Sequence, residues 1–539
     1  MGVKFIDTID DVTIDQEQKS WAGGADEFAT PTMLPDNIGG KLVNCIVEDN
    51  GRPRTRPGAD GLGGSALDAG DRVQIMAYFD TPTLEYLFAS INASLRRWDG
   101  ANWATPAGYP FGANTIVAMA QLDANLYLSD GVGQWFTFDG ATYSAGLGTG
   151  TGATGDPPVG ASMIVAHTNR LFASGTIGGV YDQVYASFIG TAGANEWNHT
   201  DFAFRVGRGE GQRITALAAG RHNILWVGKE NSIFAVFAEP NTTLAATAAA
   251  WQIDRVANSV GVVGSKAMIS AVDGVWCFGP DLALREIVPS DRQDSPFEVA
   301  PAVSEPAKPY IDRINRAALS KVVLHKYGRY LMLALPLDSA TEPNTVLVWN
   351  LRLRRPSVVA GYTLPVFIGA WTGWTPTAMV TTLFGSGGEK FVIGDSAGFV
   401  NQWKDGSDQT DDDTYEDNSV AVLATIRSKS WDFGSQRNPK DAESAEVQFI
   451  DSTGTADVVI YYDRNEQFRW NLNLETVQNE LPLDLPFDLA VLGPTISPKN
   501  LDGLATFREM FFQIEQKTVG RMELQSVAAS AFINTQENE

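Results

Sequence analysis

Cysteine and histidine are both scarce in this sequence. Only two of the 539 residues are cysteine, Cys45 and Cys277, and only four are histidine. Two cysteines are too few for a disulfide scaffold or a cysteine-rich metal site, which fits folding in a reducing compartment. The histidines are scattered without metal-ligand spacing, at His167, His199, His222 and His325. No nucleophile elbow, Walker loop or H-E-x-x-H motif is present. We therefore expect no enzyme activity, no catalytic residue, no metal and no cofactor.

Long apolar runs and an excess of basic charge are also missing. No stretch approaches 18 uninterrupted apolar residues, and the first residues contain no apolar signal region, so we expect neither a membrane-spanning segment nor secretion by a standard signal. Acidic residues outnumber basic ones by 64 to 40, which gives a net charge of −24. A surface this acidic repels phosphate backbones, so attraction to nucleic acid by counterion release is not expected.

A 40-residue repeat is the strongest pattern that the sequence does contain. Each copy has an apolar strand and a second strand that ends on an aromatic residue, followed by Asp-Gly and another aromatic. The two clearest copies are centred on Trp98-Asp99-Gly100 and on Phe138-Asp139-Gly140. Asp-Gly between β-forming residues predicts a hairpin with a type I′ turn. Hairpins that repeat every 40 residues are typical of β-propeller blades.

Degenerate copies of this phrase continue to about residue 408, which predicts an all-β protein with a β-propeller of about six to seven blades at 73–408. Residues 1–72 are polar, rich in glycine and proline and weakly periodic. They have too little apolar surface to fold alone, so we expect an extended N-terminal arm or assembly segment. Residues 419–539 contain several period-2 strands with long connections, which predicts a second, β-sandwich-like domain.

Three segments have both a chemical and a structural interpretation. Gly150–Gly155 matches G-x-G-x-x-G, but Pro157 and Pro158 follow where a dinucleotide site needs a helix, so we favour a loop. Residues 408–418 contain six acids, which suits either a cation-binding loop or an acidic linker at 409–418; we favour the linker. Trp371-Thr372-Gly373-Trp374 has the aromatic residues to stack on sugars, but such residues are more often blade core.

Three short motifs remain. The first is Asn44 … Gly51 … Arg56-Pro57-Gly58, the second is the blade phrase Ala166–Ser174, and the third is Ser430-Trp431-Asp432-Phe433-Gly434-Ser435. Together they resemble a family of virion proteins from short-tailed bacteriophages: the tail nozzle, also called tail tubular protein B, and the related head-stabilisation or tail hub proteins. The resemblance spans nearly the whole chain and makes the first motif a candidate assembly motif.

The resemblance implies a structural protein of the phage tail, assembled in the host cytoplasm. It implies a homohexameric ring that lies below the portal and adaptor protein and forms the distal tail tube. Double-stranded DNA would be retained there and would pass through during genome ejection without specific binding, and tail fibre or needle proteins are further possible partners. The acidic charge supports this independently, because like charges keep a duplex from adhering to the tube wall. Solubility alone also explains the acidity.

Two other classes of function remain open. A receptor- or glycan-binding propeller predicts exposed aromatic side chains that cluster on one face. A propeller hydrolase predicts a cluster of carboxylates or histidines in the central channel. A tail nozzle predicts neither of these, but it does predict ring-forming surfaces and a negatively charged lumen.

Overall fold

The computed structural model describes most of the chain and consists mainly of β-strands. The described residues are 13–106, 115–133, 135–145, 155–193, 196–221, 223–238, 251–271, 274–290, 296–357, 359, 361–384, 388–404, 415–434, 440–450, 452–474, 499–500 and 507–533. Helical structure within them is limited to short 3-10 turns and α1 (Lys308–Ile311). None of the helices in these ranges has the length and apolar character needed to cross a membrane. The predicted all-β class is confirmed.

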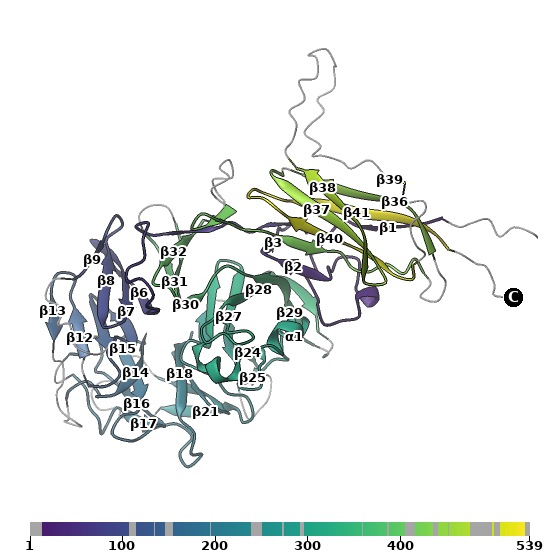
Figure 1. The fold of residues 1–539 in the computed structure, drawn as a ribbon. Coiled ribbons are helices and arrows are strands. Elements are labelled where there is room, and N and C mark those ends of the chain that lie inside the picture. The colour runs from purple at the N-terminus through teal and green to yellow at the C-terminus, as the bar shows by residue number, and fades with distance from the viewer. Residues whose placement is uncertain are drawn as a thin grey trace, which may run out of the picture.

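Sets of four antiparallel strands follow one another around a ring, and each set is one propeller blade (Figure 1). The first three blades are β6 (Val73–Thr81), β7 (Leu84–Ile91), β8 (Ser94–Trp98) and β9 (Trp103–Ala104); β10 (Ala118–Leu122), β11 (Asn125–Ser129), β12 (Trp135–Phe138) and β13 (Tyr143–Ala145); and β14 (Ala161–His167), β15 (Arg170–Gly175), β16 (Gln183–Ala186) and β17 (Ala203–Arg205). In each blade the first strand is the innermost.

The next three blades have the same order. They are β18 (Ile214–Ala219), β19 (Ile224–Lys229), β20 (Ile233–Phe237) and β21 (Gln252–Ala257); β22 (Met268–Ala271), β23 (Gly274–Phe278), β24 (Leu284–Pro289) and β25 (Phe297–Val299); and β26 (Val323–Tyr327), β27 (Tyr330–Leu335), β28 (Thr345–Pro356) and β29 (Thr363–Trp371). The short helix α1 lies in the connection between the fifth and the sixth blade.

The seventh blade closes the ring with a strand from the N-terminal region. It contains β30 (Pro376–Thr382), β31 (Lys390–Asp395), β32 (Val400–Trp403) and, as its outermost strand, β5 (Ala59–Gly61). The innermost strands contact one another in chain order, and β30 of the seventh blade contacts β6 of the first. The predicted propeller is therefore confirmed, with seven blades among the described residues. The predicted arm at 1–72 is not separate from the propeller, because β5 belongs to a blade.

The aromatic positions of the 40-residue repeat are equivalent in the structure. Trp98 ends β8, Phe138 ends β12, and both are buried. The ring of Phe138 lies 5.4 Å from that of Phe79 and 5.3 Å from that of Phe88, both in the preceding blade. The repeat therefore places one aromatic residue per blade where it packs against the neighbouring sheet, because a single blade cannot bury its own face.

The Asp-Gly hairpins form, but their turn type differs from the prediction. Asp99 Oδ1 accepts hydrogen bonds from the backbone N–H groups of Ala101 and Asn102, at 2.9 and 2.8 Å. These bonds lower the pKa of the Asp99 carboxyl. Only Gly100 has a positive φ, of 100°, whereas a type I′ turn needs two such residues. The loop between β8 and β9 has four residues, so the aspartate side chain closes it.

The second copy of the repeat has the same loop. Asp139 Oδ1 accepts from Ala141 and Thr142, and Gly140 alone has a positive φ, of 96°. The type I′ prediction is wrong at both sites for the same reason. Two consecutive residues with positive φ occur instead at Thr168 and Asn169, in the two-residue turn between β14 and β15.

The C-terminal region continues the sheet of the sixth blade. Beyond β29 this sheet runs through β2 (Lys41–Val43), β35 (Thr425–Arg427), β40 (Met510–Gln516), β37 (Thr455–Tyr462) and β38 (Asn465–Asn473), so that nine strands form one sheet (Figure 1). Within this sheet, the pairing of β2 with β29 is parallel and joins Val43 to Ala370. A strand from the N-terminal region therefore connects the propeller to the C-terminal strands.

A second sheet lies beside these C-terminal strands. It contains β1 (Thr13–Gln18), β41 (Leu524–Ile533), β36 (Lys440–Phe449) and β39 (Lys499–Asn500). Val447 and Val527 from this sheet share one hydrophobic cluster with Val458 and Ile514 from the other. A β-sandwich made of 419–539 alone stays a prediction, because β1 belongs to one of the two sheets, β2 belongs to the other, and the sheet with β2 continues into the propeller.

Candidate functional site

The first motif of the sequence folds into a hairpin that brings its two ends together. Asn44, with φ of 52°, follows β2 and precedes β3 (Cys45–Val47), which pairs with β4 (Pro53–Thr55). Gly51, in the connection, has φ of 81°, and a Cβ at that position would lie 2.2 Å from Ser20 Oγ. At the end of the hairpin the Arg56 backbone N–H donates to the Asn44 carbonyl oxygen at 2.9 Å.

The Arg56 guanidinium is fully buried at the centre of this region. It donates to Asp417 Oδ1 at 3.0 Å, to Asp417 Oδ2 at 2.5 Å and to the Thr372 carbonyl oxygen at 2.9 Å. Its carbon Cζ lies 4.3 Å from the centre of the Trp374 ring, whose Nε1 donates to Asp417 Oδ1 at 2.9 Å. We call Asn44, Arg56, Thr372, Trp374 and Asp417 the Arg56 junction.

Asn44 satisfies the remaining polar groups of the junction. Its Oδ1 accepts from the backbone N–H of Thr372 at 2.8 Å and from Arg56 Nε at 3.3 Å. Its Nδ2 donates to the Leu423 carbonyl oxygen and to Thr372 Oγ1, both at 3.0 Å. A buried arginine is stable only when its charge and its N–H groups all have partners, and here three distant segments supply them.

Pro57 and Gly58 attach the same segment to the seventh blade. The Pro57 carbonyl oxygen accepts from Trp403 Nε1 at 3.0 Å, and that of Gly58 accepts from the Lys404 backbone N–H at 2.9 Å. A Cβ at Gly58 would lie 1.8 Å from the carbonyl oxygen of Glu416, in β33 (Glu416–Asp417), which pairs with β34 (Val420–Ala421). Glycine is therefore required where these two backbones meet.

The predicted assembly-motif residues thus form an internal junction of the chain. The last part of the predicted acidic linker takes part in it through Asp417, whereas residues 405–414 lie outside the described ranges. The third motif is also internal: Trp431 exchanges backbone hydrogen bonds with Met510, and Phe433 is buried against Phe507. Trp371 and Trp374 are buried as well, in line with the blade-core interpretation rather than with sugar stacking.

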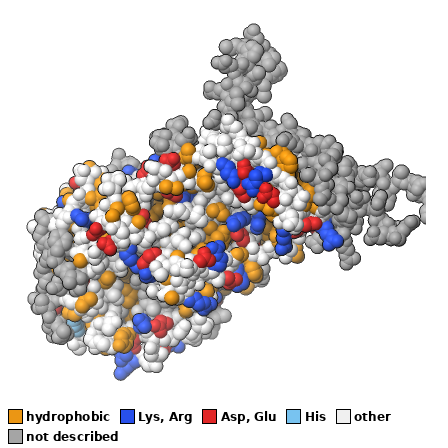
Figure 2. All heavy atoms as spheres, in the orientation of Figure 1, with side chains coloured by type: hydrophobic (Ala, Val, Ile, Leu, Met, Phe, Trp, Pro, Cys, Tyr) orange, Lys and Arg blue, Asp and Glu red, His pale blue; other side chains and the backbone are white. Residues whose placement is uncertain are grey.

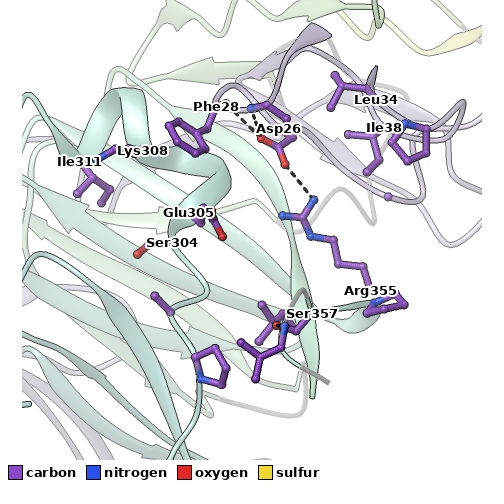
Figure 3. A pocket seen from close by; sticks show the side chains of 18 of the residues that line it. Asp26, Phe28, Leu34, Ile38, Ser304, Glu305, Lys308, Ile311, Arg355 and Ser357 are labelled. Atoms are coloured by element: carbon purple, nitrogen blue, oxygen red, sulfur yellow. Dashed lines mark hydrogen bonds and ion pairs between the residues drawn. The ribbon is translucent and has the colours of Figure 1, made fainter. Parts of the chain in front are cut away.

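A groove lies between the N-terminal region and the fifth and sixth blades (Figure 3). Its volume is about 1020 Å³. Three of its lining side chains are apolar and exposed: Phe28 by 50%, Met33 by 77% and Val359 by 45%. An ion pair between Asp26 and Arg355, 3.3 Å apart, crosses the groove. No pattern in the sequence indicates this groove, because residues 1–72 predict a polar arm and Phe28 and Met33 follow no periodic pattern there.

The histidines are not brought together. His199 Nε2 lies 2.7 Å from the Asp156 carbonyl oxygen, His325 Nε2 lies 3.1 Å from Thr381 Oγ1, and His167 packs on Phe172. His222 and most of the Gly150–Gly155 pattern lie outside the described residues. Within the described ranges no three histidine, cysteine, aspartate or glutamate side chains are placed to hold a metal ion.

His325 should make the stability of the protein depend on pH. Burial lowers its pKa to about 4, and its ring stacks on Phe391 at 5.4 Å. Below about pH 6.5 the histidine of the unfolded chain binds a proton, whereas the buried His325 of the folded chain stays neutral until about pH 4. The free energy of unfolding therefore has its full His325 contribution above about pH 6.5 and loses it as the pH falls toward 4. Urea midpoints of the wild type and His325→Phe at pH 7 and 4.5 check this. The wild type should lose more stability on acidification, and an equal loss would contradict the assignment.

Comparison with known proteins finds distantly similar solved structures and no family. No protein-family model and no curated protein sequence matches it. Solved structures similar to it include YCF48 bound to D1 peptide, at 12% identity over 63% of this chain and 93% of that one, with a TM-score of 0.38. The β-propeller domain of Cps50 (Swd1) from Myceliophteria thermophila is 10% identical over 63% of this chain and 98% of that one, with a TM-score of 0.39. No functional conclusion follows from similarity this low.

Proposed function

We propose that this chain is a structural subunit of the tail of a short-tailed bacteriophage. In this proposal identical copies close into a six-fold ring below the adaptor protein, and the ring forms the distal tube through which DNA leaves the capsid. The role of the chain is structural, and it catalyses no reaction. The proposal also places the protein in the virion, with assembly in the host cytoplasm.

The observation that carries the proposal is the Arg56 junction. Asn44 and Arg56, from the first of the three motifs that carry the resemblance, meet there, and Gly58 packs beside them against Glu416. These residues hold the N-terminal region, two blades and the 415–421 segment together. The nine-stranded sheet beside the junction makes the propeller and the C-terminal strands one continuous body. A ring closed by heterologous contacts needs a subunit of fixed shape, because small changes of angle accumulate around the ring.

The charge of the chain also supports a conduit. At a net charge of −24, the subunit repels a DNA duplex, so a tube made of it lets DNA slide without sticking. On the face in Figure 2, acidic and basic side chains are interspersed. The proposal therefore assigns the lumen to another face of the subunit.

A receptor-binding propeller is the second candidate, and the groove favours it. The exposed side chains of Phe28, Met33 and Val359 lie together at the groove, and exposed apolar side chains that cluster mark interaction sites. In this alternative the propeller acts as a binding module and the groove holds part of a surface receptor or glycan.

Mass measurement separates the two candidates. We expect native mass spectrometry of the purified chain, alone and with the adaptor ring of the same phage, to show six copies joined to the adaptor, with a tube visible by negative-stain microscopy. A monomer that ignores the adaptor, yet binds cells or glycans and loses that binding in Phe28→Ser, would replace this proposal by the receptor-binding one. Tyr181→Ser, at an exposed site outside the groove, is the matched control.

A further inference from the structure

Basic residues occur just before the innermost strands of several blades. Arg72 directly precedes β6, Lys266 lies two residues before β22, and Lys321 lies two residues before β26. Because the innermost strands surround the propeller axis and run in the same direction, their starting points lie at the same end of the central channel. Three cations from the first, fifth and sixth blades therefore gather at one mouth of the channel.

Lys266 crosses this mouth. Its Nζ donates to the carbonyl oxygen of Thr377 at 2.8 Å and to that of Gln74. Thr377 belongs to β30 of the seventh blade and Gln74 to β6 of the first, whereas Lys266 comes from the fifth. Both acceptors are uncharged, so none of the carboxylates that the structure describes pairs directly with this ammonium. Burial, together with repulsion by Arg72, lowers the pKa of Lys266 to about 7.

One carboxylate already occupies part of the site. Glu342, in the connection between β27 and β28, accepts from Arg72 at 3.2 Å and from Lys321. The Oε2 atom of Glu342 and the Nε atom of Arg72 are buried and have no hydrogen-bond partner among the described residues. Below about pH 7, where Lys266 is mostly protonated, three cations therefore face one anion, which is a local excess of positive charge in a chain whose net charge is −24.

We propose that this mouth of the channel binds a carboxylate from an acidic peptide segment of a partner protein. The contacts of Glu342 show that the arginine and the lysine are spaced to hold a carboxylate. A second carboxylate beside Lys266 would accept the hydrogen bonds that now go to neutral carbonyls. Its single negative charge would offset the excess of positive charge that Glu342 leaves. A phosphate dianion is disfavoured, because Glu342 would repel its second charge.

Among the basic residues at this mouth, Lys266 is the one available to bind the partner's carboxylate, because the others already have carboxylate partners. In the fourth blade Arg213 holds the equivalent position, one residue before β18, but it is paired with Glu230 at 2.8 Å. Among the charged groups, Arg72 and Glu342 are the ones that influence Lys266, and Lys321 is engaged with Glu342. A bound carboxylate favours the charged amine, so it raises the pKa of Lys266, and binding weakens as the pH rises above 7. This inference does not depend on the proposed tail function.

Nuclear magnetic resonance of the full-length protein with ¹³C-dimethylated lysines tests the proposal. The Lys266 signal is assigned by its loss in Lys266→Met, and that of Lys404, which pairs with Asp60 away from the channel, by its loss in Lys404→Met. The acidic peptide acetyl-(Gly-Glu)₃-amide should raise the Lys266 midpoint by about one pKa unit at constant ionic strength. The Lys404 midpoint should stay unchanged, and acetyl-(Gly-Gln)₃-amide should have no effect.

Two further arms decide between sources of the anion. Free acetate at the same carboxylate concentration should give a smaller shift than the peptide; an equal shift would mean that the site takes small carboxylates and not a peptide. A larger shift with inorganic phosphate would overturn the proposal in favour of a phosphate site, and no shift with any anion would overturn it altogether. If Lys266→Met does not fold, Lys321→Met provides the second test, because it should reduce the shift caused by the peptide.

Discussion

Replacing Arg56 by methionine should lower the free energy of unfolding by about 3–5 kcal/mol. The side chain of Arg56 is 0% exposed and that of its partner Asp417 is 12% exposed, so the substitution leaves a mostly buried carboxylate without its counter-ion. It also leaves the carbonyl oxygen of Thr372 without this donor. Urea unfolding followed by tryptophan fluorescence measures the loss.

The matched control for Arg56 is an arginine in an exposed ion pair. Arg313 binds Asp338 with side-chain exposures of 52% and 58%. Arg313→Met should therefore change the stability by no more than about 1 kcal/mol, because solvent screens such pairs. Equal losses in the two variants would show that burial of the Arg56 pair does not matter for stability, and would remove the main physical support for a rigid junction.

Replacing Gly58 by alanine should be nearly as harmful, with a loss on the order of 3 kcal/mol. The added Cβ would lie 1.8 Å from the Glu416 carbonyl oxygen, a backbone atom that cannot rotate away. The clash pushes the 57–61 segment from its place, and with it β5, the outermost strand of the seventh blade. We expect limited proteolysis near β5 to become faster in Gly58→Ala, in parallel with a lower thermal midpoint.

Gly100→Ala separates the clash at Gly58 from the general effect of losing a glycine. Gly100 has φ of 100° and no atom within 4 Å of the Cβ that alanine would add. Its replacement should cost about 1 kcal/mol, through backbone strain alone. Proteolysis near β5 should stay at the wild-type rate in this variant. If Gly58→Ala behaves like Gly100→Ala, the close approach of the two backbones is not a constraint in solution.

The propeller was predictable from local features of the sequence. Trp98 and Phe138 lie at equivalent blade positions because each hairpin uses the same short-range alternation and must bury its aromatic residue against the neighbouring sheet. The turn type was less predictable. Asp99-Gly100 is compatible with several loops, and the four-residue length selected the one that the aspartate side chain closes.

The junction was predictable only in part. Asn44, Arg56 and Gly58 stood out as a motif, but nothing near them in the sequence identifies Asp417, which lies 361 positions after Arg56. The same holds for β5, which pairs with β32 across more than half of the chain. Nothing in the sequence marks Lys266 as a functional residue, since a lone lysine before a strand is normally solvated. Only the closure of the propeller ring brings its ammonium to the carbonyl oxygens of Thr377 and Gln74.

The sequence by itself determined the β-rich class, the blade period and the acidic charge of this protein, because these depend on composition and on neighbours within one hairpin. The tertiary structure alone decided the number of blades, the strand that closes the ring and the partners of each buried charge. Those depend on contacts between distant segments, where many pairings satisfy the same local pattern. The closed ring and the continuous sheet select one of them, since only that arrangement buries every blade face and pairs Arg56 with Asp417.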